Sequence, residues 1–422
     1  MENSTRHIAV IDLKAFYSFV ECIDRGLDAW KTPLVVADKD RGKNTIVLSV
    51  SPFLKSKGVP SRLRIRDLPR GYDYIYAIPR MERYVEKSSE VVGIMGKFVS
   101  FDDIFVYSID EAFIDLTTYI DYYKKQDYEI VEMIINEIKK ETGLQATGGV
   151  GDNFFLAKVA LDVYAKKAPN GIAIIRKKDV PKKLWPITPL NKVWGIGERT
   201  EAKLNALGIH NLGDLAHCNL SFLQNQFGVM GEQLYNHANG NDEADMHEEY
   251  TPKSRSLSVG QVLFKDYNKK NIITVIREMN DDLSSKLREE NKMSQLVSLY
   301  VGYSKEEMGG FSRQMSLLVP TNETKTLFNA IIEIFNKHIE NKPIRRIGIS
   351  YGKLTPATHQ QLNLLKETHE QLQEQELQLA VDKIQRKYGK NILLRASALS
   401  EDSTAIERHN QIGGHRKWVI EE

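Results

Sequence analysis

The sequence contains few cysteines and no long hydrophobic run. Cys22 and Cys218 are the two cysteines among 422 residues, and they lie far apart, with no Cys-x-x-Cys spacing and no clustered histidines. This pattern excludes a cysteine-based zinc site and a disulfide framework, and it is typical of the reducing cytosol. Because no run of 18 apolar residues occurs and no apolar run follows the first charged residues, we expect neither a membrane span nor secretion, and we predict a cytoplasmic location.

The sequence also lacks a strong charge of either sign. Its formal net charge is +2, which by itself points to no particular partner. Charged residues make up 27% of the chain and hydrophobic residues 41%, which is typical of a soluble globular protein with ordinary cores. At this length we expect several domains.

Two adjacent acids, Asp110 and Glu111, interrupt a stretch that is otherwise rich in Tyr, Val, Ile and Phe. The flanking residues predict a strand, a tight turn and a second strand over residues 105–116. Placing two acids in sheet-forming sequence costs solvation and like-charge repulsion, and a shared divalent cation would remove both costs. The alternative is a solvated hairpin tip, where surface charge is common.

A second acid stands near the N-terminus. The apolar run Ile8–Ile11 predicts a buried strand that ends at Asp12, and the aromatic pair Phe16 and Tyr17 follows. Polar active-site groups often lie where a buried strand ends. If this strand neighbours the hairpin, Asp12 and the two hairpin acids form a cage for two hard cations, which would suit phosphoryl transfer.

At these residues the chain resembles a known family. An Asp at a strand end followed by an aromatic pair, and Ser-Ile-Asp-Glu-Ala at 108–112, are similar to the first two motifs of Y-family translesion DNA polymerases. The resemblance is greatest to the UmuC/UvrX-like UV-damage repair subgroup of Gram-positive bacteria. It implies an α+β multidomain right-hand polymerase, with a ferredoxin-like palm, small fingers, a helical thumb with a helix-hairpin-helix, and an α/β little finger. The expected boundaries are palm 1–22 and 78–172, fingers 23–77, thumb 173–245, linker 246–254, little finger 255–355 and C-terminal tail 356–422.

The resemblance also implies a set of site residues. Asp12, Asp110 and Glu111 would hold two Mg²⁺ ions, with the Leu13 carbonyl as a further ligand. Phe16 and Tyr17 would lie under the incoming sugar, where the Tyr17 ring would exclude a ribose 2′-hydroxyl; plain core positions are the alternative for both. The basic residues expected near the triphosphate are Lys55, Lys158, and one of Lys166 and Lys167.

Some positions depart from the family pattern. Lys55 stands where relatives have Arg, so it can neutralise phosphate only as a point charge, and a solvated helix face is its alternative. Pro52 takes the place of a Tyr, and Phe154 takes the place of the first Lys in the family's Asn-Lys-x-x-Ala-Lys pattern. Whatever that Lys does is not carried over to this chain.

DNA contacts are expected in two regions. Gly195-Ile-Gly197 would open a helix whose free N–H groups bind the DNA backbone, although an ordinary turn between packed helices is the alternative. Arg255 and Ser256 begin the expected little finger. Residues 253–353 carry 17 Lys and Arg against 11 Asp and Glu, a net charge of +6.

The remaining periodic segments predict further elements. Gly148–Asp152 is expected to be a flexible loop. Gln361, Leu362, Leu364 and Leu365 resemble the peptide that binds a bacterial sliding clamp, with the start of an amphipathic helix as the alternative; residues 381–418 receive no role. The expected strands are 33–37, 45–49, 295–303, 314–320 and 345–351, and the expected helices are 51–59, 79–98, 128–140, 154–162, 271–288 and 323–339. Residues 190–209 are expected to form the helix-hairpin-helix, and residues 256–266 resemble the opening of the family's little finger.

The sequence thus predicts a monomeric, template-directed DNA polymerase that takes part in translesion synthesis and the SOS response. Its expected partners are primer-template DNA, deoxynucleoside triphosphates and a sliding clamp. A non-catalytic DNA-binding accessory that retains the fold is the first alternative. A nucleotidyl cyclase is the second, because a palm with paired acids can perform that chemistry too.

Overall fold

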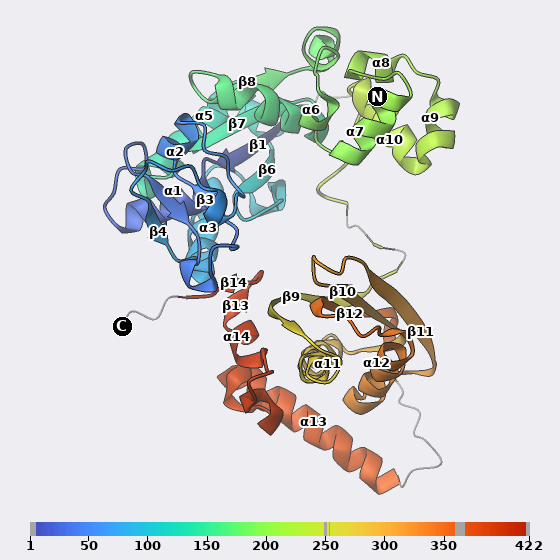
Figure 1. The fold of residues 1–422 in the computed structure, drawn as a ribbon. Helices are drawn as coiled ribbons and strands as arrows, with labels where there is room; N and C mark the ends of the chain where they lie inside the picture. The colour runs from blue at the N-terminus through green and yellow to red at the C-terminus, as the bar shows by residue number, and fades with distance from the viewer. Residues whose placement is uncertain (1–5, 249–250, 253, 359–367, 419–422) are drawn as a thin grey trace. The chain divides into compact units, whose positions relative to one another are not determined.

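The computed structural model describes residues 6–248, 251–252, 254–358 and 368–418. The chain divides into an N-terminal unit, Met1–Glu249 with Trp418–Glu422, and a C-terminal unit, Tyr250–Lys417. Figure 1 shows the elements of each unit. Within the described ranges, no helix combines the length and apolar character needed to cross a membrane.

A five-stranded sheet forms the centre of the N-terminal unit, in the order β5-β6-β1-β7-β8. The first four of these strands follow the order of a ferredoxin-like fold, as the sequence predicts. Apolar residues of β1 are fully buried because helices cover both faces of the sheet. The elements are β1 (Ile8–Leu13), β5 (Ile104–Val106), β6 (Glu111–Asp115), β7 (Ala146–Gly151), β8 (Ile172–Ile175), α3 (Met81–Met95), α4 (Tyr119–Tyr123), α5 (Asp127–Thr142) and α6 (Phe154–Val159).

Two smaller parts complete this unit. A three-stranded sheet of order β3-β2-β4 has its own core, and a group of short helices packs around Leu204, Leu215 and Leu234. The first part contains α1 (Phe16–Asp24), β2 (Leu34–Val36), β3 (Ser49–Val50), α2 (Pro52–Ser56) and β4 (Ile75–Ala77). The second contains α7 (Glu198–Ala206), α8 (Leu212–Ala216), α9 (Leu220–Phe227) and α10 (Val229–Ala238).

Three local predictions are wrong. Gly148–Asp152 is not a loop, because Gly148 to Gly151 lie in β7, which pairs with both β1 and β8. The predicted strand at 45–49 begins only at Ser49, since Ile46 makes an isolated bridge to Arg64 instead. The apolar periodicity of residues 79–98 also predicts that Val85 faces the core, but Val85 is 44% exposed.

The glycines of β7 allow a helix to pack directly on the strand. A Cβ at Gly149 would lie 2.2 Å from the carbonyl oxygen of Ala157 and 2.5 Å from the amide nitrogen of Leu161, and a Cβ at Gly151 would meet the same backbone. Close approach of two backbones is therefore the reason for glycine here, rather than chain flexibility.

We expect Gly149→Ala to lower the free energy of unfolding by about 3 kcal/mol or more, because backbone atoms cannot move aside as a side chain can. Gly93→Ala is the matched control, since a Cβ on this helical glycine of α3 meets no described atom within 4 Å. The control should gain up to about 1 kcal/mol from helix propensity. Urea denaturation of both variants tests this, and equal stability would contradict the packing role of Gly149.

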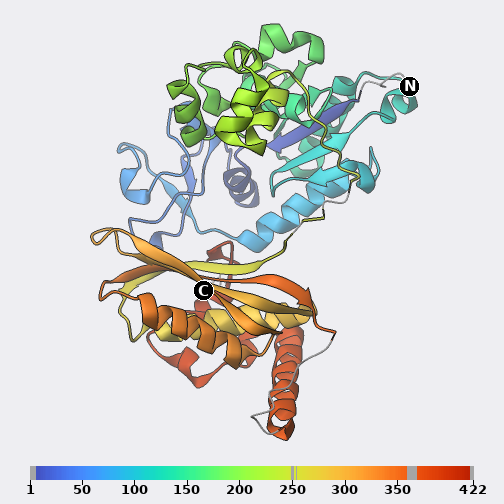
Figure 2. The same ribbon diagram turned by 90° about the vertical axis from the view of Figure 1, so that its right-hand side faces the viewer.

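The C-terminal unit is built on an antiparallel sheet of order β11-β10-β12-β9. Figure 2 shows two long helices, α11 and α12, against one face of this sheet. Their buried apolar residues and those of the strands form one core. The elements are β9 (Leu257–Tyr267), α11 (Ile272–Glu289), β10 (Lys292–Tyr303), β11 (Gly310–Thr321), α12 (Thr324–His338) and β12 (Ile344–Pro356).

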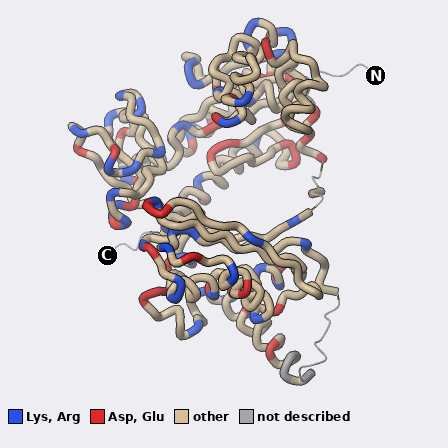
Figure 3. The backbone as a smooth tube through the Cα atoms, turned by 45° about the vertical axis from the view of Figure 1, so that its right-hand side comes forward, with Lys and Arg blue, Asp and Glu red and all other residues tan. Residues whose placement is uncertain are grey.

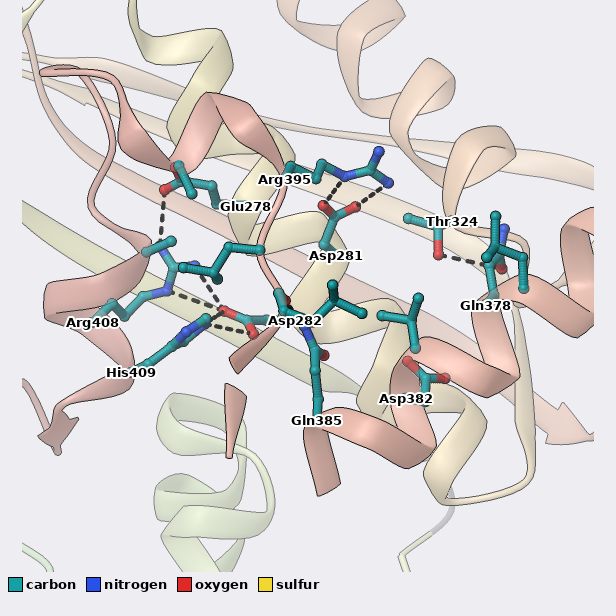
Figure 4. Close-up of a pocket in the computed structure, with 16 residues that line it drawn as sticks. Glu278, Asp281, Asp282, Thr324, Gln378, Asp382, Gln385, Arg395, Arg408 and His409 are labelled. Atoms are coloured by element: carbon teal, nitrogen blue, oxygen red, sulfur yellow. Dashed lines mark hydrogen bonds and ion pairs between the residues drawn. The ribbon is translucent and has the colours of Figure 1, made fainter. Parts of the chain in front are cut away.

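The chain after residue 367 packs back on α11 of the same unit. Asp282 of α11 forms ion pairs with Arg408 at 2.7 Å and Lys390 at 2.9 Å, and it contacts His409 at 3.0 Å. These charges hold the pKa of the Asp282 carboxyl below its usual range against the effect of burial. Figure 4 shows Asp282, Arg408 and His409 among the residues that line a cavity of about 400 Å³. The elements are α13 (Thr368–Tyr388), α14 (Ala405–His409), β13 (Gln411–Ile412) and β14 (His415–Arg416).

Candidate active site

The two acid-bearing segments are neighbours, as the sequence predicts. Strands β1 and β6 pair antiparallel with Asp12 directly opposite Glu111. Directly opposed residues place their side chains on the same face of a sheet. The Leu13 amide donates to the Asp110 carbonyl at 2.8 Å, which fixes the turn before β6 against the end of β1. Asp110 itself is half-buried, and its carboxylate accepts a hydrogen bond from the Ser108 hydroxyl at 2.8 Å.

A buried lysine neutralises part of this acid group. Lys158 of α6 donates to Glu111 Oε2 at 2.8 Å and lies 3.0 Å from Asp162. Burial opposes the charged form of Lys158, but the hydrogen bond to Glu111 and the nearby carboxylates outweigh it and raise the lysine pKa. Burial raises the pKa of Glu111, although Lys158 counteracts this. A buried ion pair keeps both groups oriented at the cost of their hydration.

A second lysine extends the charge network to Asp12. Lys166 forms an ion pair with Asp162 at 2.9 Å and lies 3.9 Å from Asp12. Burial raises the pKa of Asp12, and Lys166 opposes the shift while the charge of Asp110 adds to it. Both lysines that the sequence leaves open are exposed, but Lys166 faces the carboxylates, whereas Lys167 forms no ion pair with an acid of the described residues. The sequence predicts Asp162 only as a structural companion of Lys158, whereas in the structure it joins Lys158 to Lys166.

The oxygen atoms available at this site are of the kind that binds hard divalent cations. The site offers three carboxylates and the Leu13 carbonyl, and Mg²⁺ prefers oxygen ligands. Glu111 Oε1 is buried and has no hydrogen-bond partner among the described residues, which leaves a ligand atom free. The carboxylates do not close into a cluster, however: in the described ranges no three acidic, His or Cys side chains are gathered tightly enough to hold a metal. Lys158 contributes to this, because it draws Glu111 towards α6.

The aromatic pair after Asp12 has one buried and one half-exposed member. Phe16 is 3% exposed and belongs to the core. Tyr17 is half-buried, and its ring lies 4.6 Å from that of Tyr84 between centroids. Burial raises the pKa of Tyr17, and the charge of Asp110 adds to the shift. Tyr17 therefore lies near the carboxylates and is backed by a second ring.

A polar network that sequence analysis missed holds Tyr84 in place. Its hydroxyl donates to Glu21 at 2.7 Å, and Arg80 donates to the same carboxylate at 2.9 and 3.1 Å. Glu21 is fully buried and also forms an ion pair with Arg25. Burial raises the pKa of Tyr84 strongly. The available signal was an acid in the apolar run Phe19–Cys22, where a buried charge requires partners.

The short helix α2 adds one more cation. Ser51 caps α2 by accepting from the Leu54 amide, and Lys55 lies in its last turn. Burial lowers the pKa of Lys55, while the charges of Asp12 and Asp110 oppose the shift. Lys55 thus interacts electrostatically with these two carboxylates, and its contact with a triphosphate stays a prediction.

The predicted DNA-binding turn lies at the start of α7. Gly195 has φ of +88°, a left-handed conformation that favours glycine, and Gly197 is the N-cap. Both glycines are exposed, and a Cβ at either would meet no described atom within 4 Å. Backbone N–H groups at this helix end are therefore accessible to an anion.

The remaining residues predicted to bind DNA or a sliding clamp lie in the C-terminal unit or outside the residues that the structure describes. Arg255 and Ser256 are exposed and directly precede β9. Lys and Arg residues occur on several segments of both units rather than in one block (Figure 3). The expected clamp-binding residues lie outside the described residues and are Gln361, Leu362, Leu364 and Leu365.

Three family models match the chain. Residues 11–162 match the impB/mucB/samB family, residues 177–209 match the helix-hairpin-helix motif of that family, and residues 254–364 match its C-terminal domain. The first match includes all three carboxylates, and the second includes Gly195 and Gly197.

Similar proteins span nearly the whole chain. The UvrX protein of Bacillus subtilis (strain 168), whose name assigns it provisionally to UV-damage repair, is 34% identical over 97% of this chain and 98% of its own length. DNA polymerase IV 2 of the same organism is 30% identical over 97% and 98%. Among solved structures, the Y-family DNA polymerase chimera Dbh-Dpo4(243-245)-Dbh matches with a TM-score of 0.66 over 83% of this chain and 99% of its own, at 22% identity.

Proposed function

Because this chain belongs to the impB/mucB/samB family of Y-family polymerases, we propose that it is a template-directed DNA polymerase that copies past damaged bases. The observation that carries the proposal is the pairing of Asp12 with Glu111 beside Asp110, next to three lysines that can face a triphosphate. Carboxylates next to cations are the arrangement that nucleotidyl transfer requires. Induction with the SOS response and a cytoplasmic location would fit this role.

Asp12, Asp110, Glu111 and the Leu13 carbonyl would hold two Mg²⁺ ions. Such ions supply activation of the primer 3′-hydroxyl and neutralisation of the triphosphate charge. Lys158 keeps Glu111 ionised and oriented, and Lys55 and Lys166 neutralise phosphate oxygens. The Tyr17 ring closes the space beside the incoming sugar. The chain's own contribution is therefore to position the reactants and to balance their charges.

The proposed domain roles follow from the same placement. The five-stranded sheet would be the palm, the three-stranded sheet the fingers, and the helices α7 to α10 the thumb. The β9–β12 sheet would be the little finger. Primer-template DNA would be the nucleic-acid partner, and a sliding clamp would bind the 361–365 segment.

A primer-extension assay on the full chain tests the proposal. We expect template-dependent addition of deoxynucleotides with Mg²⁺, inhibition by EDTA, and extension past a template UV lesion. Retained DNA binding without extension would instead favour the non-catalytic accessory. Pro52 and Phe154, which depart from the family pattern, are the residues that support this alternative. Conversion of a nucleoside triphosphate to a cyclic product without DNA would favour the cyclase.

A further inference from the structure

An aromatic cluster in the N-terminal unit connects the carboxylate hairpin to the DNA-binding turn. Phe113 is its centre, with ring centroids 5.1 Å from Phe154, 5.8 Å from Tyr107 and 6.3 Å from Trp194. Trp194 and Tyr107 also meet directly, edge to face, at 5.9 Å. Tyr107 and Phe113 come from the hairpin, Phe154 from α6 and Trp194 from the turn before α7, so the cluster joins three parts that are distant in the sequence.

Trp194 links the DNA-binding turn to the sheet. It directly precedes Gly195, and its neighbours Val193 and Ile196 are buried in the core of the short helices. The Trp194 ring also packs partly against that core, and its Nε1 donates to the Tyr107 hydroxyl at 3.2 Å. The turn is therefore held from two sides, by apolar packing beneath it and by one aromatic contact to the sheet.

Tyr107 belongs to the hairpin that carries the acids. Its backbone amide donates to the Glu111 carbonyl at 3.0 Å, and the Ser108 amide donates to the same oxygen at 3.0 Å. The side chain of Tyr107 is 45% exposed, so its contact with Trp194 lies at the surface and can separate without disturbing a core. The contact between Tyr107 and Trp194 therefore joins the turn at Gly195 to the loop that holds Asp110.

We propose that Trp194 and Tyr107 form an aromatic latch that holds the DNA-binding turn in register with the carboxylate hairpin. The inference rests on the proposed function and deepens it, because it assigns two positioning residues for duplex DNA. It also accounts for Phe154, since a ring packs on Phe113 where the family pattern places a lysine. The latch sets how tightly primer-template DNA is held and how many nucleotides are added per binding event.

Three substitutions separate the parts of the latch. Trp194→Leu removes both the ring and the hydrogen bond, Trp194→Phe keeps a ring, and Tyr107→Phe removes only the hydroxyl that accepts from Trp194. From the usual strength of aromatic pairs, we expect Trp194→Leu to raise the Kd for primer-template DNA about fivefold to tenfold. Tyr107→Phe should raise it about twofold to threefold, with Trp194→Phe in between.

The matched control is Tyr122→Leu, which alters a 77% exposed ring on α4 that contacts Tyr123 and not the cluster. Its Kd and its product lengths should equal those of the wild type. For Trp194→Leu we expect shorter products per binding event, while kcat at saturating DNA falls less than about twofold, because the acids themselves are intact. If Trp194→Leu lowered kcat but left the Kd unchanged, the latch proposal would be wrong. It would also be wrong if Trp194→Leu had the melting temperature and the Kd of the wild type.

The failure of the latch and of the polymerase assignment are distinguishable. Binding is measured by fluorescence anisotropy of labelled primer-template, which needs no catalysis, and it is repeated in the Asp110→Ala background. If the wild type binds DNA without extending it, the polymerase proposal fails, and the Kd series still tests the latch. If extension occurs and the Kd is the same for all three variants, the latch alone fails.

Discussion

Asp110→Ala is expected to abolish primer extension while DNA binding persists. The lost carboxylate is one of three that would hold the catalytic ions, and metal ions contribute several kcal/mol of transition-state stabilisation. A loss of about 4 kcal/mol corresponds to about a thousandfold lower rate. The fold should tolerate the change, because the link between the turn and β1 is made by the Asp110 backbone carbonyl, which the variant keeps.

Single-nucleotide incorporation and anisotropy together measure this outcome. Asp121→Ala is the control, since Asp121 is an exposed acid on α4. This substitution removes one negative charge, as Asp110→Ala does, but it removes no proposed metal ligand. It should extend primers at the wild-type rate. If Asp110→Ala retained extension within tenfold of the wild type, the assignment of Asp110 to the ions would be wrong.

Tyr17→Ala is expected to admit ribonucleotides. Its half-buried ring lies near Asp110 and is backed by Tyr84, so it cannot retreat to make room for a 2′-hydroxyl. Removing the ring opens that space, and we expect the preference for deoxynucleotides over ribonucleotides to fall by about 100-fold. The ratio of kcat/KM for matched dCTP and CTP opposite a template guanine measures the effect.

Tyr17→Phe is the conservative variant for this experiment. It keeps the ring and its contact with Tyr84, so it should discriminate between sugars as the wild type does. A Tyr17→Ala enzyme that extends primers with an unchanged sugar preference would remove Tyr17 from this role. Tyr84→Phe keeps the ring behind Tyr17 but loses the hydrogen bond to Glu21. The same measurement on this variant shows whether sugar discrimination depends on that hydrogen bond.

The central arrangement of the site was accessible from the sequence because its signals are local. An apolar run that stops at Asp12 and a second run interrupted at Asp110 predict two strands with solvent-accessible ends. The pairing of β1 with β6 confirms that these strands are neighbours. The choice between Lys166 and Lys167 was left open, although the spacing of four residues between Asp162 and Lys166 was an available signal for their ion pair.

Other features depend on tertiary contacts that leave no local pattern. The glycines of β7 have the composition of a loop, and the helix that packs on them is the reason for glycine. Asp281 and Asp282 on α11 have the composition of a solvated face, but Arg395 and Arg408 from more than a hundred residues later cover them. Side chains that pair across such separations cannot be matched by spacing alone.

The buried pair of Lys158 and Glu111 has a consequence for handling the protein. Because a resident lysine already supplies positive charge at the acids, the fold does not depend on added ions to relieve their repulsion. Chelation should therefore silence the enzyme reversibly and leave its melting temperature almost unchanged. The lysine acts as a built-in counterion that offsets the charge of Glu111 and Asp162 whether or not an ion is bound.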